Sequence, residues 1–494
     1  MICRTDSYDS LNWATLSSPS IKVVIFQCVI HWGLNAHAGT DVCSDGGLFE
    51  ISGISGLKPF ALWSKASNSF ADVGSYNYWM SPTPLVDLLD SQSLSNFGES
   101  FSKGEALRLL DFARNSVVPE GGFGYLDLNG EVDRSHPREL YVQCRMIQVF
   151  GLGYLLGLSE SLDMVNDGVD ALLGVFLDTE NSGFFNSVDY SNRPVDANKL
   201  AYGHAFVLLA ASTAKACNHP KADELLRLVD SVIDTYFWDA EYGMLNNSWN
   251  REFSICDPYR GVNANMHGVE AFIAAFDVTG EQKYQERALI VCKKVVDGFA
   301  QSNSWMLPEH FDSGWNADLE FNSDKPADPF CPYGVTIGHL FEWSRLVIQV
   351  ALQNAGDPDA VSWVLPDAVN LYQLAKEAGW SADGTDGFIY TMDWNKTPVV
   401  RSRMAWVVAE AIMAAYSLWI TTNDAKYLDD FNAWWRYALA NMLDFEYGSW
   451  FHELNPDQGV IDTTWPGKPD VYHAFNACLL TMYPFKASFV GVVL

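Results

Sequence analysis

The chain has 494 residues, which suits one large helical or α/β barrel with an extension. Its 61 acidic residues against 31 basic ones give a formal net charge of −30. No basic run offsets that charge, which argues against nucleic acid or an anionic membrane as a partner and favours a small molecule. The 14% aromatic content, with 18 Trp, is typical of cavities that bind sugar rings, and equally of a large aromatic core.

The nine cysteines are scattered, with no C-x-x-C pair and no other zinc-ligand spacing. This pattern indicates a reducing, cytoplasmic location and no structural metal. No stretch approaches about 18 consecutive apolar residues, so no membrane span is predicted. We expect no cofactor, and whether copies of the chain form a homo-oligomer is left open.

Residues 1–94 differ from the rest of the chain. They are rich in Ser, Gly and Asn and show little helical periodicity, which predicts a poorly organised extension outside the functional protein. The apolar run at 23–30 and the Ala-His-Ala sequence after it imitate a secretory signal, but acidic residues replace the expected basic leader. We therefore expect folding and function to begin near Met80, with the functional domain at 95–494.

The helical pattern begins at Ser102, where Ser102-x-x-Glu105 is predicted to be a capping box ahead of an apolar helix face. From there a turn signal that combines Gly with aromatic or apolar residues returns six times, mostly about 60 residues apart. That interval holds two helices of about four turns and their connections. The six signals are Gly122–Tyr125, Gly183–Phe185, Tyr242–Met244, Trp305–Leu307, Gly387–Tyr390 and Tyr447–Trp450.

A stretch rich in small and apolar residues follows each signal, which is typical of helices buried among other helices. The intervening stretches, such as Lys221–Tyr236 and Glu281–Phe299, carry a charged face for solvent. Because alternation with period two is rare, we predict an all-α (α/α)6 barrel of six helical hairpins. The predicted inner helices are Tyr141–Leu156, Ala201–Ala214, Asn265–Phe276, Thr336–Leu352, Arg401–Leu418 and Asp470–Met482.

One inner helix carries the ionisable pair His267 and Glu270, three residues apart. On a helix this spacing places both side chains on one face, and the apolar residues around them place that face inside the protein. A buried imidazole beside a carboxylate suits general acid/base catalysis near neutral pH. Taken alone, the pair could equally be a core histidine with a structural hydrogen bond.

Every predicted inner helix carries polar or ionisable groups near its start. Because these helices run in the same direction, the groups are predicted to converge at one mouth of the barrel. Packing hardly explains so many of them, since unpaired buried polar groups are costly, and we therefore predict a functional site. The groups are Arg145, His204, His267 with Glu270, His339 with Glu342, Arg403 with Glu410, and His473.

Ordered motifs run from about residue 95 to the end, among them Asn263–Glu270, Gly338-His-x2-Glu-Trp343 and Gly467–His473. They resemble those of the N-acylglucosamine 2-epimerase family, and most closely its aldose–ketose isomerase branch. The resemblance implies an (α/α)6 barrel that isomerises a monosaccharide without metal or nucleotide. It also implies that His267 and His473 are the catalytic proton-transfer pair.

The residues suit this chemistry. Moving a sugar carbonyl from C1 to C2 needs ring opening, removal of the C–H beside the carbonyl, and delivery of a proton to the neighbouring carbon through an enediol. Arg145 would hold the sugar oxygens and the developing oxyanion. Further predicted substrate contacts are His204, Arg260, Glu270, His339, Glu342, Trp406 and His452, with Trp315 and Trp343 as other candidate walls.

His452 and Pro469 stand where sulfoquinovose isomerases are expected to carry Gln, so a neutral sugar and D-mannose/D-fructose interconversion are favoured. Sulfoquinovose isomerase and an N-acylglucosamine or aldose 2-epimerase are the alternatives within the family. A glycoside hydrolase would need two carboxylates flanking the scissile bond. A sugar-binding protein without turnover would have no use for a histidine pair.

Overall fold

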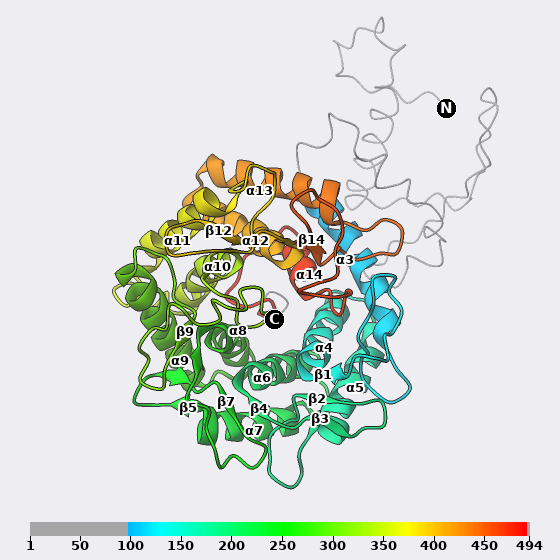
Figure 1. Ribbon diagram of the computed structural model, residues 1–494. Helices are drawn as coiled ribbons and strands as arrows, with labels where there is room; N and C mark the ends of the chain where they lie inside the picture. The colour runs from blue at the N-terminus through cyan, green and yellow to red at the C-terminus, as the bar shows by residue number, and fades with distance from the viewer. Residues whose placement is uncertain (1–96, 492–494) are drawn as a thin grey trace, which may run out of the picture. The chain divides into compact units, whose positions relative to one another are not determined.

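The computed structural model describes residues 97–491. In this part of the chain twelve α-helices, α3 to α14, form an inner and an outer layer, which Figure 1 shows in a view along the axis of the ring. The predicted (α/α)6 barrel is therefore confirmed. The extension predicted at 1–94, including Met80, lies outside the described residues.

The inner helices surround the axis, and α14 closes the ring by contacting both α12 and α4. They are apolar on nearly every side because the two neighbours and the outer layer bury them. The observed bounds lie within a few residues of the predicted ones. The inner helices are α4 (Leu140–Leu155), α6 (Ala201–Ala216), α8 (Val262–Thr279), α10 (Ile337–Gln353), α12 (Ala405–Thr422) and α14 (Tyr472–Leu479).

The outer helices are amphipathic and pack their apolar stripes against the inner ring. Four of them continue into π-helix, which accounts for the longer helices predicted at 221–236 and 281–299. The outer helices are α3 (Glu99–Ala113), α5 (Ser161–Ala171), α7 (Ala222–Val232), α9 (Gln282–Cys292), α11 (Val364–Gly379) and α13 (Ala425–Tyr437). The π-helical continuations are Leu172–Phe176, Ile233–Phe237, Lys293–Ala300 and Ala438–Met442, and a 3₁₀ turn follows α3 at Arg114–Ser116.

The capping box predicted at Ser102 was wrong. Helix α3 begins at Glu99, so Ser102 and Glu105 lie within it and are fully buried. Glu105 instead accepts hydrogen bonds from Arg108 and from the Trp450 indole, the latter at 2.8 Å. An S-x-x-E spacing also places both side chains on one buried helix face, which explains the error.

Short antiparallel strand pairs lie at the end of the ring where the inner helices begin. Five of the strands end at the residue before an inner helix, namely β1, β4, β8, β10 and β13. Each of these strands pairs with a strand farther along the chain, and this pairing fixes where the helix starts. The strands are β1 (Arg138–Glu139), β2 (Ser187–Val188), β3 (Pro194–Asp196), β4 (Lys199–Leu200), β5 (Trp238–Asp239), β6 (Met244–Leu245), β7 (Ser248–Trp249), β8 (Arg260–Gly261), β9 (His310–Phe311), β10 (Val335–Thr336), β11 (Thr391–Met392), β12 (Pro398–Val400), β13 (Arg403–Met404) and β14 (Glu453–Leu454).

The first three inner helices each hold the preceding Gly-aromatic turn by the same kind of hydrogen bond. In each case a side chain on the fourth residue of the helix accepts a hydrogen bond from a backbone N–H 20 residues earlier. The turn is thereby fixed against the start of the inner helix. The pairs are Phe123 N–H to Gln143 Oε1 at 2.7 Å, Phe184 N–H to His204 Nε2 at 3.1 Å, and Leu245 N–H to Asn265 Oδ1 at 2.7 Å.

Helix α12 alone among the described helices is long and apolar enough, by composition, to cross a membrane. Its most apolar window is 67% buried inside the ring, so its place in the inner layer explains this composition. The six cysteines within residues 97–491 are free thiols.

Candidate active site

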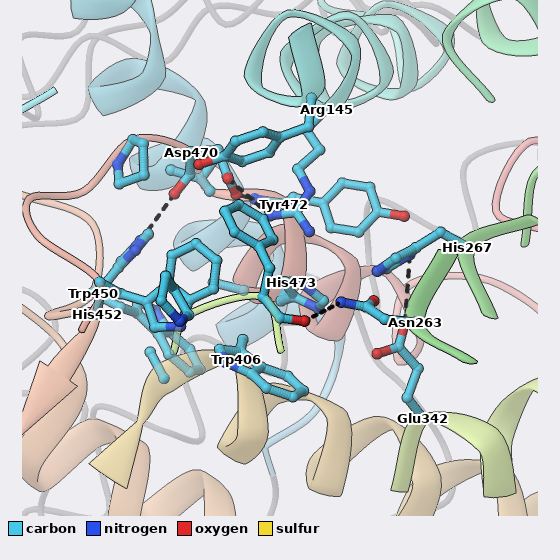
Figure 2. Close-up of a pocket in the computed structure, with 18 of the residues that line it drawn as sticks. Arg145, Asn263, His267, Glu342, Trp406, Trp450, His452, Asp470, Tyr472 and His473 are labelled. Carbon is cyan, nitrogen blue, oxygen red and sulfur yellow. Dashed lines mark hydrogen bonds and ion pairs between the residues drawn. The ribbon is translucent and has the colours of Figure 1, made fainter. Parts of the chain in front are cut away.

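A cavity of ≈ 820 Å³, counting the space open to solvent, lies at the end of the ring where the inner helices begin. That size suits a small organic ligand. Figure 2 shows side chains from several inner helices and loops directed into it. Its lining includes Tyr141, Arg145, Tyr202, Asn263, His267, Pro329, Phe330, His339, Glu342, Tyr390, Trp406, Trp450, His452, Trp465, Pro469, Asp470, Tyr472 and His473.

Most of the helical part of this lining is arranged in two layers. The second residues of five inner helices form the outer layer, and sixth residues form the floor, about one turn deeper. The ring therefore aligns equivalent positions on one cavity. The outer layer is Tyr141, Tyr202, Asn263, Trp406 and His473, and the floor is Arg145, His267 and Glu342.

His267 reaches the floor of the cavity from α8. Its Nδ1 lies 3.3 Å from Glu270 Oε2 and 3.9 Å from Glu342 Oε1, and the Phe206 ring packs on it with centroids 4.6 Å apart. Burial lowers the pKa of His267, although its hydrogen bond to Glu270 opposes the shift. The imidazole is therefore neutral near pH 7, and a proton on Nδ1 leaves Nε2 free to accept another.

His473 enters the same cavity from α14 (Figure 2). Its Nδ1 lies 2.8 Å from Glu410 Oε1, so it forms a second histidine–carboxylate pair on a different inner helix. Burial lowers the pKa of His473 well below the usual value, and the charge of Arg145 adds to this effect. Two neutral imidazoles thus share one cavity.

One guanidinium lies within ion-pair distance of three carboxyl groups at and below the cavity floor. The Nη2 atom of Arg345 lies 3.8 Å from Glu270 Oε1, 3.6 Å from Glu342 Oε1 and 3.0 Å from Glu410 Oε2. All four side chains are almost fully buried. We call this group, Arg345 with Glu270, Glu342 and Glu410, the buried charge cluster.

Three carboxylates and one arginine cannot all be charged at low cost in a dry interior. Burial, reinforced by Glu410, raises the pKa of Glu342 well above the usual value. Although burial acts in the same direction on Glu270, its hydrogen bond from His267 and the charge of Arg345 lower the pKa of Glu270 to about 2. Glu342 is therefore a neutral carboxyl that can donate a proton, while Glu270 is a carboxylate.

Arg145 is held rigidly at the cavity floor. Its Nη1 donates to Asp470 Oδ2 at 3.0 Å and its Nη2 donates to the Tyr202 hydroxyl at 3.0 Å. The guanidinium also lies over the Phe206 and Tyr472 rings, at 4.7 and 5.0 Å from their centroids. A fixed, permanently charged fork of this kind suits the binding of a developing oxyanion.

Two further histidines line the cavity, as predicted from the sequence. His339 Nδ1 lies 2.9 Å from Glu309 Oε1, and its ring packs on Trp406 with centroids 5.2 Å apart. His452 Nε2 lies 3.1 Å from the carbonyl oxygen of Asp470, to which it donates. The structure thus brings Arg145, His267, His339, Glu342, Trp406, His452 and His473 together, with Glu270 just beneath them.

His204, predicted to contact substrate, does not line the cavity. Its Nδ1 donates to the carbonyl oxygen of Leu200 at 2.8 Å and its Nε2 accepts from the N–H of Phe184, so the backbone occupies both ring nitrogens. Burial lowers the pKa of His204 to about 3. His204 therefore has a structural role, and the close approach of the turn needs glycine, because a Cβ on Gly183 would lie 2.9 Å from its Nε2.

Arg260 and Arg403 also stay outside the cavity, contrary to expectation. Each is the first residue of a strand that precedes an inner helix, and each ties a loop. Arg260 donates to the carbonyl oxygens of Asp257 and Tyr259, and Arg403 donates to Asp383 at 2.7 Å. Two of the candidate walls, Trp315 and Trp343, are packed in the core.

Several lining residues were missed by sequence reasoning, among them Tyr202, Phe330, Trp450 and Asp470. The sequence did contain a signal for Tyr202. Tyr141, Tyr202 and Asn263 are spaced by 61 residues, so they occupy the same position in successive repeats. Phe330, in contrast, lies in the long connection between β9 and β10, which has no counterpart in the other repeats. Arg345 was missed although it follows Glu342 by three residues.

Two groups of side chains have a spacing that could hold a metal ion. His267, Glu270 and Glu342 bring ligand atoms within 4.8 Å of one another, and so do Glu342, Glu410 and His473. The Arg345 guanidinium already lies among the three carboxylates, so a divalent cation there would meet a fixed positive charge. The donor set thus fits an arginine-neutralised proton-transfer site better than a metal centre.

We expect the acid limb of kcat/KM to lie below pH 6.5, the ordinary imidazole pKa. Burial lowers the pKa of both His267 and His473, so the neutral bases persist to lower pH than free histidine would allow. A pH profile of kcat/KM measures this, because it reports groups of the free enzyme. An acid limb above the ordinary value would show that the cavity stabilises imidazolium instead.

The family model described as N-acylglucosamine 2-epimerase (GlcNAc 2-epimerase) matches residues 121–477. A D-mannose isomerase of Thermobifida fusca is 44% identical over 390 residues, which cover 79% of this chain and 95% of that protein. A D-mannose isomerase of Pseudomonas cannabina pv. alisalensis is 39% identical, covering 79% and 94%. A crystal structure of a D-mannose isomerase superposes with a TM-score of 0.73 at 26% identity, covering 78% of this chain and 98% of the other.

Proposed function

Because this chain belongs to the N-acylglucosamine 2-epimerase family, we propose that it is an isomerase that interconverts D-mannose and D-fructose. The observation that carries the proposal is the pair of histidine–carboxylate dyads, His267–Glu270 and His473–Glu410, on separate inner helices at one cavity. The cavity size fits a monosaccharide. The six free cysteines among the described residues support a reducing, cytoplasmic location.

In the open-chain aldose, one neutral imidazole takes the proton from C2, and its electron pair forms the C1=C2 bond of an enediol while O1 gains a proton. The O2–H proton is then removed as a proton is delivered to C1, which gives the ketose. His267 and His473 together move these protons. The two protons taken, from C2 and O2, equal the two delivered, to O1 and C1, so both imidazoles return to their starting state, and the acidic partner at Nδ1 stabilises the imidazolium that forms transiently.

Arg145 and Glu342 support the charge that develops on oxygen. The Arg145 fork, oriented by Asp470 and Tyr202, can donate to the carbonyl oxygen as it becomes an oxyanion. The neutral Glu342 carboxyl on the floor can donate a further hydrogen bond. The half-buried Trp406 ring offers an apolar face on which the carbon side of a sugar can stack.

We expect the enzyme to form D-fructose from D-mannose after dialysis against EDTA, with deuterium from D₂O at C1 of the product. An imidazole that carries the abstracted proton can exchange it with solvent before returning it. NMR of the product measures both the sugar and the label. Loss of turnover with chelator, or unlabelled fructose, would indicate a metal-assisted hydride shift, and D-glucose as the product would identify a 2-epimerase.

We also expect D-mannose to be a far better substrate than the anion sulfoquinovose. Among the described residues of the lining, the guanidinium of Arg145 is already paired with Asp470, and His452 and Pro469 stand in place of amide donors. Paired replacement, His452→Gln with Pro469→Gln, should shift the ratio of kcat/KM values toward the sulfonated sugar. Sulfoquinovose as the best substrate of the unmodified enzyme would overturn this expectation.

A further inference from the structure

The mechanism above leaves one histidine–carboxylate pair unused. His339, the third residue of α10, lines the cavity and is 6% exposed, and its Nδ1 lies 2.9 Å from Glu309 Oε1. Glu309 is itself buried, immediately before β9. This geometry repeats that of His267 with Glu270 and His473 with Glu410.

The surroundings of His339 differ from those of His204 and His452. The backbone occupies both ring nitrogens of His204, and the Nε2 atom of His452 donates to a carbonyl oxygen. Within residues 97–491, the partner found for His339 is Glu309, at Nδ1. Its Nε2 is thus left for a ligand in the cavity.

The proposed reaction has a step that needs such a group. A hexose is mostly a cyclic hemiacetal, and the C2–H bond becomes acidic only after the ring opens to expose the C1 carbonyl. Opening removes the proton from the O1 hydroxyl, breaks the C1–O5 bond and places a proton on O5. O1 and O5 are both bonded to C1, so one nitrogen can reach both atoms.

We propose that His339, supported by Glu309, catalyses ring opening, an inference that rests on the proposed function. The lone pair of Nε2 takes the O1 proton while the C1–O5 electron pair moves to O5, and the imidazolium then returns that proton to O5. Glu309 stabilises the imidazolium through Nδ1–H, and no proton is gained or lost overall. His339 is thus a third catalytic residue, separate from the pair that acts at C1 and C2.

The position of Trp406 fits separate roles for His339 in ring opening and His473 in proton transfer. Its ring centroid lies 5.2 Å from that of His339 and 5.8 Å from that of His473. A sugar stacked on Trp406 can therefore place its reacting end near both imidazoles. Ring opening and proton transfer can then follow each other in one bound position.

The test measures interconversion of the D-mannose anomers, which needs ring opening but no isomerisation. Saturation transfer between the two anomeric protons gives the rate at equilibrium, for several enzyme concentrations. We expect the wild type to accelerate this exchange, and His339→Gln to lower the acceleration about 10²-fold or more. Glu309→Gln should lower it less and shift its pH dependence, which a purely structural role would not do.

His136→Ala is the matched control, because His136 also pairs with a carboxylate, Asp133 at 2.8 Å, but does not line the cavity. Its anomer exchange should equal that of the wild type, and circular dichroism should show all variants folded. No acceleration by the wild type, or acceleration retained by folded His339→Gln and His339→Ala, overturns the inference. The fructose assay tests the proposed function separately, because it scores the product and not the anomers.

Discussion

His473→Ala and His267→Ala should each lower kcat for mannose by about 10²–10⁴-fold, the usual contribution of a general acid or base. Each substitution removes one imidazole whose Nδ1 is held by a buried carboxylate, and no other described lining group has the same position. Steady-state kinetics with purified variants measure the loss. Incorporation of deuterium from D₂O into unconverted mannose then shows whether the first proton is still removed.

The control is again His136→Ala, which should keep the wild-type kcat, and thermal unfolding should show that the cavity variants remain folded. Deuterium entering mannose in only one of the two histidine variants would assign the first transfer to the remaining imidazole. Full turnover by either variant would remove that residue from the mechanism and leave Glu342 as the next candidate.

The barrel could be predicted because helix burial is visible in sequence. Inner helices such as α8 and α12 are apolar around most of their circumference, and outer ones carry a charged stripe. The bounds were less predictable where short strands take over. Helix α12 was predicted to begin at Arg401 but begins at Ala405, because Arg403 and Met404 pair with β14 instead.

The site was predictable only in part, because an apolar pattern does not tell which side of a fully buried helix faces the axis. His204 is the fourth residue of α6, whereas Arg145 is the sixth residue of α4. Two residues correspond to roughly 200° around a helix, so these positions point in nearly opposite directions. The fourth position anchors a turn and the sixth reaches the cavity.

Arg260 and Arg403, which stand two positions ahead of inner helices, were wrongly predicted to lie at the cavity for a related reason. Arg138, Lys199 and Arg260 are spaced by 61 residues, and Arg403 is in the equivalent place. All four begin strands and bind the oxygens of nearby loops, as in Lys199 to Asp178 at 3.1 Å. Repetition of a basic residue at this position is therefore a signal of loop anchoring and not of a substrate contact.

Arg345→Met should lower the free energy of unfolding by about 3–5 kcal/mol near neutral pH. Met has a similar length but leaves the carboxylates of the buried charge cluster, and above all Glu270, without their counter-charge. Glu410 would then favour its protonated form, which changes the group that holds His473 Nδ1. Urea denaturation measures the stability, and kcat should fall in the same variant.

The pH dependence separates this electrostatic loss from a packing loss. The pKa of Glu270 is lowered to about 2 in the folded protein, so its ionised form contributes stability above the unfolded value of about 4.3, and this contribution is lost as pH falls toward 2. Without Arg345 part of that contribution disappears, so the deficit of Arg345→Met should be largest near neutral pH and shrink below pH about 4.3. Arg114→Met, which breaks an exposed pair with Glu160, should cost about 0–1 kcal/mol. If Arg345→Met lowers the free energy of unfolding by the same amount near neutral pH and below pH about 4.3, the loss is due to packing alone.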